Sequence, residues 1–245
     1  MKKINRFISC IILTIVICSF MSNKVYAAEE LEQYKVEITN ESLANSNDPI
    51  VRENIEILLQ AQKRFEKMDE DELNNYIDTS LILMDSKVAA NSTFTIVELK
   101  TMWLAAAQVA KLKGYTCSAK LVECSVLGLN YSETTGDSGL IRDKIVTTQT
   151  YKNILSGVNS KKYPLNKKVG GYFSKSENAD LYYAIASFDF TPSKPGQRIN
   201  ITFTDTYNFE PAKYNDIFTG TVNNWAVLCQ YTGVLNQIFV SVKVA

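Results

Sequence analysis

Histidine does not occur anywhere in the 245 residues of this chain. Its absence excludes the Ser-His-Asp and Cys-His mechanisms of nucleophilic catalysis, and it excludes zinc sites built from histidine ligands. It also removes the side chain that most often carries protons near neutral pH. Any turnover would therefore depend on carboxylates, hydroxyls, amines or thiols.

Motifs for nucleotides and metal ions are missing as well. The sequence contains neither a Gly-x-x-x-x-Gly-Lys loop nor a Gly-x-Gly-x-x-Gly run, which are the usual phosphate-binding signatures. Asp69 and Asp71 have the opening spacing of a calcium loop, but Leu73 and Asn74 stand where a ligand and a glycine are required. We therefore expect no cofactor and no bound metal, and we interpret the two aspartates as a helix start.

The segment Gly136-Asp137-Ser138-Gly139 is similar to the nucleophile segment of chymotrypsin-like proteases. It is followed by Leu140, however, and the chain has no histidine to act as a base. We interpret it as a turn in which Ser138 caps the next helix.

The N-terminus carries an extended apolar run. Three basic residues within the first six precede an uncharged stretch over 7–20, and small residues follow up to Ala27. This order of basic, apolar and small residues is typical of a secretory signal peptide, and the run is shorter than the roughly 20 residues needed to cross a bilayer. We predict that residues 1–27 are a signal peptide cleaved between Ala27 and Ala28, and that the secreted, extracellular chain has no stable membrane insertion.

Acidic and basic residues balance in the full chain, with 26 of each. Four of the basic residues lie in the predicted signal peptide, so the secreted chain carries 22 basic and 26 acidic groups. A mildly acidic protein has no general attraction to nucleic acid, because phosphates are bound mainly by Lys and Arg. We expect no nucleic-acid partner and instead an extracellular or cell-surface partner whose identity is unknown.

Cysteine is scarce, and three of the five cysteines remain after cleavage: Cys117, Cys124 and Cys229. If Cys117 and Cys124 share a helix, their spacing separates them by about 10 Å, which is too far for a disulfide. A disulfide would therefore pair Cys229 with Cys117 or Cys124. The alternative, which we favour, is that all three are small buried side chains.

The first half of the chain predicts helices. Residues 28–48 form a polar N-terminal arm without a helical stripe, whereas apolar residues recur at helical spacing across a helical region over 49–158. The first predicted helix begins at Pro49 after Asp48, and the second begins near Asp69 or Asp71. Two further helices are predicted over 96–113 and 116–127, and a fifth from Ile141 to Leu155. The clearest start is the capping box of Thr95 with Glu98, flanked by Phe94 and Leu99 as a hydrophobic staple. The pattern indicates an N-terminal bundle of about five helices.

A basic loop over 159–171 carries four lysines and ends in Gly170-Gly171, and we place the main domain boundary there. We interpret the lysines Lys161, Lys162, Lys167 and Lys168 as a solvated connector, with contact to an anionic surface such as a cell-wall polymer as the alternative.

Aromatic residues concentrate after this loop, which favours strands. We predict strands over 182–191, 198–207 and 238–244, and a helix over 222–229 that ends before Gly233. Region 172–245 thus has the order strand, strand, helix, strand, in a small and mostly antiparallel sheet packed on the helices. Helices followed by such a sheet make the fold class α+β.

Four aromatic residues beside the basic loop have two interpretations. Tyr172, Phe173, Tyr182 and Tyr183 could stack on sugars, but aromatic pairs at a strand start more often belong to the core or cover the sheet. We expect the second role.

Three acids are the candidate catalytic residues. Asp205 follows Ile201 and Phe203 in phase, so its carboxylate should point to the apolar face, where burial would raise its pKa. If the hairpin is symmetric about Lys194 and Pro195, Glu210 falls opposite Asp180, and the three acids Asp205, Asp180 and Glu210 gather near the hairpin base. Paired carboxylates could act as acid and base in a glycosidase. A bulge or a capping role for Asp205 is the alternative that we favour.

The C-terminal part is similar to uncharacterised exported proteins of Gram-positive bacteria. The residues that carry the resemblance are Asp180-Leu181-Tyr182-Tyr183-Ala184, Asp205-Thr206-Tyr207-Asn208-Phe209, Trp225 and Gly233-Val234-Leu235, together with the helical hairpin around Gly114-Tyr115-Thr116. The resemblance implies a bacterial, extracellular setting and carries no activity.

Two functions remain open from the sequence. The first, which we favour, is a secreted, non-catalytic binding or interaction protein. The second is an extracellular hydrolase or toxin-like domain that acts on a polymer through Asp205 and a second acid.

Overall fold

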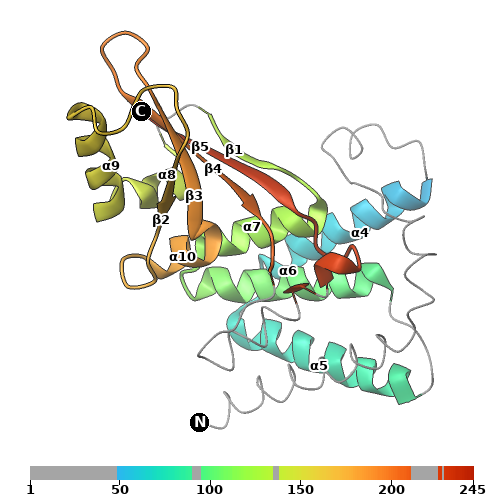
Figure 1. Cartoon of the computed structure of the whole chain (residues 1–245). Coiled ribbons are helices and arrows are strands. Elements are labelled where there is room, and N and C mark those ends of the chain that lie inside the picture. The colour runs from blue at the N-terminus through green and yellow to red at the C-terminus, as the bar shows by residue number, and fades with distance from the viewer. Residues whose placement is uncertain (1–48, 90–94, 135–137, 211–225, 228) are drawn as a thin grey trace. The chain divides into compact units, whose positions relative to one another are not determined.

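The computed structural model describes residues 49–89, 95–134, 138–210, 226–227 and 229–245. Helices fill the first part of this range, and a five-stranded sheet follows, so the α+β class is confirmed (Figure 1). Several predictions fall outside the described residues: the signal peptide over 1–27 with cleavage between Ala27 and Ala28, the polar arm over 28–48, the cap at Asp48 and the staple residue Phe94.

The chain divides into two compact units that interleave along the sequence. The first unit takes residues 1–109, 126–128 and 208–237, and the second unit takes 110–125, 129–207 and 238–245. The boundary that we predicted at 159–171 does not separate them, because this stretch lies inside the second unit.

Helices of the first unit begin where short-range capping signals stand in the sequence. Helix α4 runs over Pro49–Phe65, α5 over Glu70–Ala89 and α6 over Ile96–Leu112. Asp69 and Glu72 cap each other's backbone amides before α5, at 2.8 and 3.0 Å. The predicted box before α6 is confirmed, since Thr95 N donates to Glu98 Oε2 at 3.0 Å and Glu98 N donates to Thr95 Oγ1 at 3.2 Å.

Apolar and aromatic contacts hold α4 and α5 together. Leu58, Phe65 and Leu73 are almost fully buried. The rings of Phe65 and Tyr76 lie 4.8 Å apart, and the Arg64 guanidinium lies over both of them. The two helices therefore share an apolar stripe at the predicted spacing.

Helix α7 covers Thr116–Leu127, the range that the sequence predicts. It follows α6 after a turn at Gly114, whose φ of +88° is the left-handed conformation that glycine adopts readily. Residues 226–227 and 229–231 are helical, and this helix ends before Gly233 as predicted, while most of its range over 222–229 lies outside the described residues.

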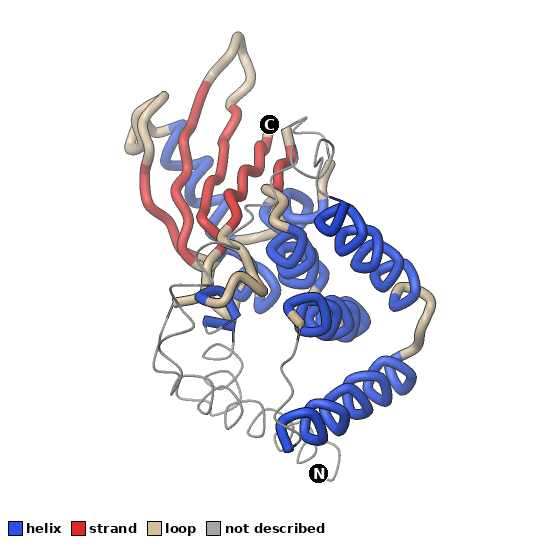
Figure 2. Tube along the Cα trace, turned by 90° about the vertical axis from the view of Figure 1, so that its right-hand side faces the viewer, coloured by secondary structure: helices blue, strands red, loops and turns tan. Residues whose placement is uncertain are grey.

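The sheet of the second unit has the order β1-β5-β4-β3-β2. Its strands are β1 Tyr131–Glu133, β2 Val169–Tyr172, β3 Ser187–Ser193, β4 Asn200–Tyr207 and β5 Ile238–Val244. All neighbours are antiparallel except β1 and β5, which are parallel (Figure 1). Figure 2 shows the strands of the sheet side by side. The sequence prediction missed both edge strands, because β1 has three residues and β2 contains two glycines.

Alternation along the strands separates the two faces of the sheet. Phe190, Phe203 and Val242 lie on one face and are buried, and helix α9 (Gln149–Asn159) contacts this face through Tyr151, 6.4 Å from the Phe203 ring. The other face carries hydroxyl side chains such as Thr202 and Thr204, which are partly exposed. The sheet thus packs its core on one side only.

Residues 182–185 are helical, which corrects the predicted strand over 182–191. Helix α10 runs over Ala179–Ile185, and β3 begins only at Ser187. Asn178 caps the helix, because its Oδ1 accepts from Leu181 N at 3.0 Å. The local cap outweighs the strand preference of the two tyrosines that follow it.

The predicted helix over 141–155 is two helices, α8 over Leu140–Ile145 and α9. Thr148 starts a new helix at this point, because its side chain accepts from Tyr151 N at 3.0 Å. The predicted cap at Ser138 is wrong, since Gly139 is the N-cap of α8 and makes no side-chain hydrogen bond. In the part of the chain that the structure describes, no helix is both long and apolar enough to cross a membrane.

Candidate functional site

Asp180, in the first turn of α10, lies at the centre of a buried polar network. Its carboxylate accepts from the backbone amides of Cys117 and Ser118 at 2.9 Å each and from Ser118 Oγ at 2.7 Å. Lys144 Nζ lies 2.5 Å from Asp180 Oδ2. Since Cys117 and Ser118 are in the first turn of α7, Asp180 caps that helix from another element.

This environment fixes the charge of Asp180. Burial by itself raises the pKa of the carboxyl, but the hydrogen bonds from Lys144, Ser118 and Cys117 outweigh it and hold the pKa below its usual value of 3.8. Both oxygens are already occupied by donors from the protein. An ionised and fully coordinated carboxylate cannot donate a proton to a substrate near neutral pH, which argues against a role as general acid.

Glu133, at the end of β1, caps the N-terminus of α8 in the same way. Its two oxygens accept from Ile141 N at 2.9 Å and from Arg142 N at 2.8 Å, and Oε1 also accepts from the hydroxyl of Tyr131. A Cβ on Gly139 would lie 2.3 Å from Glu133 Oε2. Glycine at this position is therefore what allows the carboxylate to reach the helix start.

Glu177, between β2 and α10, serves α9. It accepts from Thr150 N and from Thr150 Oγ1, each at 2.7 Å. Asp180, Glu133 and Glu177 thus cap three consecutive helices, α7, α8 and α9, from other elements of the second unit. Their roles are structural, and local sequence patterns do not reveal them because each acid is eight or more residues from the amides that it caps.

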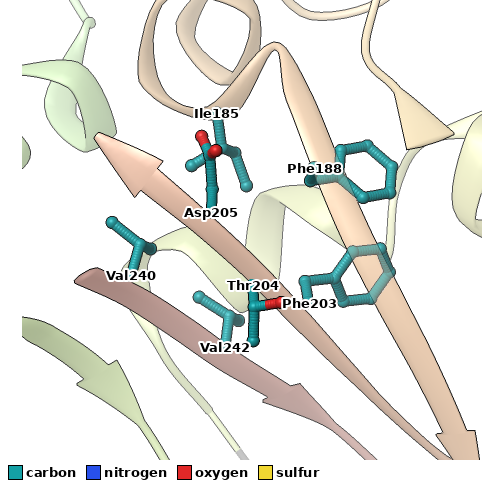
Figure 3. Close-up of a pocket in the computed structure, with 7 residues that line it drawn as sticks. All are labelled: Ile185, Phe188, Phe203, Thr204, Asp205, Val240 and Val242. Carbon is teal, nitrogen blue, oxygen red and sulfur yellow. The ribbon is translucent and has the colours of Figure 1, made fainter. Parts of the chain in front are cut away.

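Asp205 points to the apolar face of β4, as predicted from its phase with Ile201 and Phe203. It lines a hollow between α10 and the sheet that has no room for a water molecule, and Figure 3 shows its carboxylate next to Ile185. The described residues that line the hollow include no second acid; they are Ile185, Phe188, Phe203, Thr204, Asp205, Val240 and Val242.

Burial raises the pKa of Asp205 to about 6, and the nearby charge of Asp189 adds to the rise, while the hydrogen bond from Thr206 N opposes it. The expected direction of the shift is therefore confirmed. The hollow, however, is smaller than the 300 Å³ or more that is usual for a ligand site, and it offers a polymer no second carboxylate.

The predicted acid cluster does not form around the hairpin. Asp180 lies in a helix, so Glu210 has no strand position opposite it, and the observed pairing of Pro192 with Ile201 differs from symmetry about Lys194 and Pro195. Glu210 is exposed, belongs to the first unit and accepts from Asn208 Nδ2 at 3.2 Å. Asp180 and Asp205 belong to the second unit and lie in different surroundings.

Cys117, Cys124 and Cys229 are buried free thiols in the structure, which is the arrangement that we favour over a disulfide of Cys229 with Cys117 or Cys124. Burial is the main cause that raises the pKa of Cys117 to about 12, and Asp180 adds to it. A thiol with such a pKa is almost entirely protonated at neutral pH and is a poor nucleophile.

No role for a buried lysine is predicted from the sequence, yet Lys100 of α6 is buried. Its Nζ donates to Val126 O, near the end of α7, at 2.7 Å. Burial lowers the pKa of Lys100 to about 8. The ammonium serves a helix carbonyl, which is a structural role at the negative end of a helix.

Four tyrosines of the second unit form a continuous row near these caps. Tyr172 and Tyr182 have ring centroids 6.2 Å apart, Tyr182 and Tyr183 5.2 Å, and Tyr183 and Tyr115 5.9 Å. Tyr172 is 53% exposed, and the others are partly exposed. Phe173, by contrast, is fully buried, so the expected core role holds for this residue and not for its neighbour Tyr172.

Lysines of the predicted basic loop are exposed. Lys168 pairs with Asp189 of β3 at 2.9 Å, while Lys161, Lys162 and Lys167 are open to solvent. Within the described ranges, no group of three or more acidic or cysteine side chains could hold a metal ion.

The geometry thus assigns Asp180, Glu133 and Glu177 to helix capping and leaves the tyrosine row as an accessible cluster. Comparisons with protein-family models, with curated proteins and with solved structures found no match for this chain.

Proposed function

We propose that the chain is an exported protein that binds a partner outside the cell and does not catalyse a reaction. The observation that carries the proposal is the use of the carboxylates of Asp180, Glu133 and Glu177 as helix caps. Asp180 is held ionised by four donors within 3.0 Å, and Glu133 and Glu177 accept from helix amides in the same way. Side chains that stabilise helix starts are not available for acid–base steps.

Export and bacterial origin belong to the same proposal. The order of basic, apolar and small residues before Ala28 supports a cleaved signal peptide. The arrangement of the N-terminal helices as one bundle is also part of the proposal. If the full chain is expressed in a Gram-positive host, N-terminal sequencing of the protein from the medium should begin at Ala28. Full-length protein that begins at Met1 and stays with the cells would refute export.

Binding without turnover can be tested with purified protein of residues 28–245 and cell walls from a Gram-positive bacterium. The protein should sediment with the walls, and the supernatant should contain no newly released reducing ends or peptides. Release of soluble fragments that increases with protein concentration would overturn the non-catalytic assignment. Tyr231→Ala, a change at an exposed residue of the first unit, serves as the surface control.

A second candidate function is supported by the raised pKa of Asp205. A carboxyl with a pKa of about 6 is suited to act as a general acid, as in a hydrolase or toxin-like domain that acts on a polymer. In that case Asp205→Asn should abolish turnover and leave the fold intact. Turnover at an unchanged rate in this variant would remove the candidate.

A further inference from the structure

We infer that the row of Tyr172, Tyr182, Tyr183 and Tyr115 is a carbohydrate-binding surface for an extracellular glycan that bears anionic groups. This inference rests on the proposed binding function and names the surface and the class of partner. The row is built from three separate elements: the end of β2, the helix α10 and the turn between α6 and α7 (Figure 1).

The chemistry of the row differs from that of the core beside it. The neighbouring core rings are phenylalanines, since Phe173, Phe188 and Phe203 contact one another with centroids 4.5 to 6.4 Å apart and are buried. The four rings of the row all carry a hydroxyl. A tyrosine presents an apolar ring and a polar tip together, which suits a surface that is wet on one side and contacts a partner on the other.

Ring geometry in the row is fixed before any ligand binds. Adjacent rings are inclined at 71° to 83°, so each edge rests near the face of its neighbour. Rigid aromatic side chains lose little conformational entropy on binding. A pre-formed row of this kind offers ring faces and hydroxyls at fixed positions, so a sugar that stacks on one ring can reach the hydroxyl of the next.

The buried network around Asp180 holds the row in place. Tyr182 and Tyr183 follow Asp180 in α10, and Tyr115 directly precedes α7, whose first amides Asp180 caps. Lys144 adds a link, because its Nζ contacts both Asp180 and Gly114 O, at 2.5 and 3.3 Å. The network thus fixes α10 relative to the turn that carries Tyr115.

Charge near the row favours an anionic glycan. Lys175 Nζ lies 5.0 Å from the centre of the Tyr183 ring, and the exposed loop around it also presents Ser176. Sugar C–H faces would stack on the phenol rings, sugar hydroxyls would bond to phenol and serine hydroxyls, and an acidic substituent would meet the lysine.

The experiment compares two probes: cell walls of a Gram-positive bacterium, intact or after extraction of their anionic polymers. Binding of residues 28–245 is measured by sedimentation. We expect Tyr172→Ala and Tyr182→Ala to weaken binding at least fivefold, Tyr172→Phe to weaken it about twofold or less, and Tyr231→Ala to have no effect. Lys175→Gln should weaken binding to intact walls and leave binding to extracted walls unchanged. Unaltered thermal unfolding confirms that each variant is folded.

Each contrary result has a separate meaning. Wall binding that is unchanged in the folded Tyr172→Ala and Tyr182→Ala variants would overturn the assignment of the tyrosine row and leave the proposed binding function intact. Failure of the wild-type protein to bind either wall preparation would overturn the assignment of a glycan as the partner. If a proline-rich peptide competes with the walls for the protein and soluble wall glycan does not, the row is a peptide-binding surface, and the assignment of a glycan partner is overturned.

Discussion

Two aspartates of the second unit show how opposite environments act on one residue type. Asp180 is surrounded by amides, a hydroxyl and an ammonium, and its pKa is lowered. Asp205 lies among Ile185, Phe188 and Val240, and its pKa is raised. Ionisation of Asp180 therefore stabilises the fold, whereas ionisation of Asp205 opposes it.

Asp205→Asn should make the protein more stable at pH 7.5. The folded pKa of about 6 exceeds the ordinary value of 3.8, so the contribution of the protonated form is complete below pH 3.8 and is lost as the pH rises through 6. Asparagine keeps an acceptor for Thr206 N and removes the buried charge. We expect a gain of about 1 kcal/mol in the free energy of unfolding at pH 7.5.

Urea unfolding at pH 4.0 and 7.5 provides the measurement. The gain should shrink at pH 4.0, because the wild-type carboxyl is then almost fully protonated in the folded state and about 40% protonated in the unfolded state. A loss of stability at pH 7.5 would contradict the burial argument.

Asp180→Asn should have the opposite effect. An amide cannot accept on both sides, so the variant leaves Lys144 and an α7 amide without their charged acceptor, at a cost of about 2–4 kcal/mol. Because the folded pKa is lowered, the wild-type contribution is present above pH 3.8 and is lost as the pH falls through the folded pKa.

Chemical denaturation at neutral pH measures this loss, with Asp143→Asn as the matched control. Asp143 is an exposed acid that pairs with Arg142, so its replacement should cost less than about 0.5 kcal/mol. Equal effects of the two substitutions would show that the buried network contributes no more than a surface ion pair.

Capping is the common theme among the helices. Helices α5 and α6 begin with boxes whose two members are three residues apart. Helices α7, α8 and α9 receive carboxylates from other elements. A local cap stabilises one helix, whereas a carboxylate from another element also fixes the position of the helix relative to that element.

Gly139→Ala tests a cap of the second kind. The new Cβ would meet Glu133 Oε2 at 2.3 Å and displace it from the amides of Ile141 and Arg142. We expect a loss of about 1–2 kcal/mol in the free energy of unfolding. The measurement is thermal unfolding, with Gly170→Ala as control, because nothing lies within 4 Å of a Cβ at that glycine. A fully stable Gly139→Ala variant would show that the Glu133 cap is dispensable.

At the scale of the molecule, the chain crosses between its two units several times. A fragment over 159–245 lacks β1, which pairs with β5, and lacks α8 and most of α9. We expect it to be unfolded, with poor dispersion in an NMR amide spectrum, because its apolar sheet face has no cover. Native-like dispersion would support the domain boundary at the basic loop.

Burial of the thiols gives another test of the whole molecule. Cys117, Cys124 and Cys229 are each less than 10% exposed. Purified residues 28–245 should show three thiols with Ellman's reagent in denaturant without reductant, and slow reaction in the native state. A single reactive thiol in denaturant would reveal a disulfide.

The sequence by itself determined the features that depend on residues close in the chain. The Thr95–Glu98 box, the bounds of α7, the alternation of β5 and the phase of Asp205 are all short-range patterns, and each is present as predicted. Only the tertiary structure decided that β1 pairs with β5 and that Asp180 caps α7. Ser118 and Asp180 are 62 residues apart in the chain, and Asn130 and Phe239, which join the start of β1 to β5, are 109 residues apart. Contacts between such distant residues leave no local pattern in the sequence.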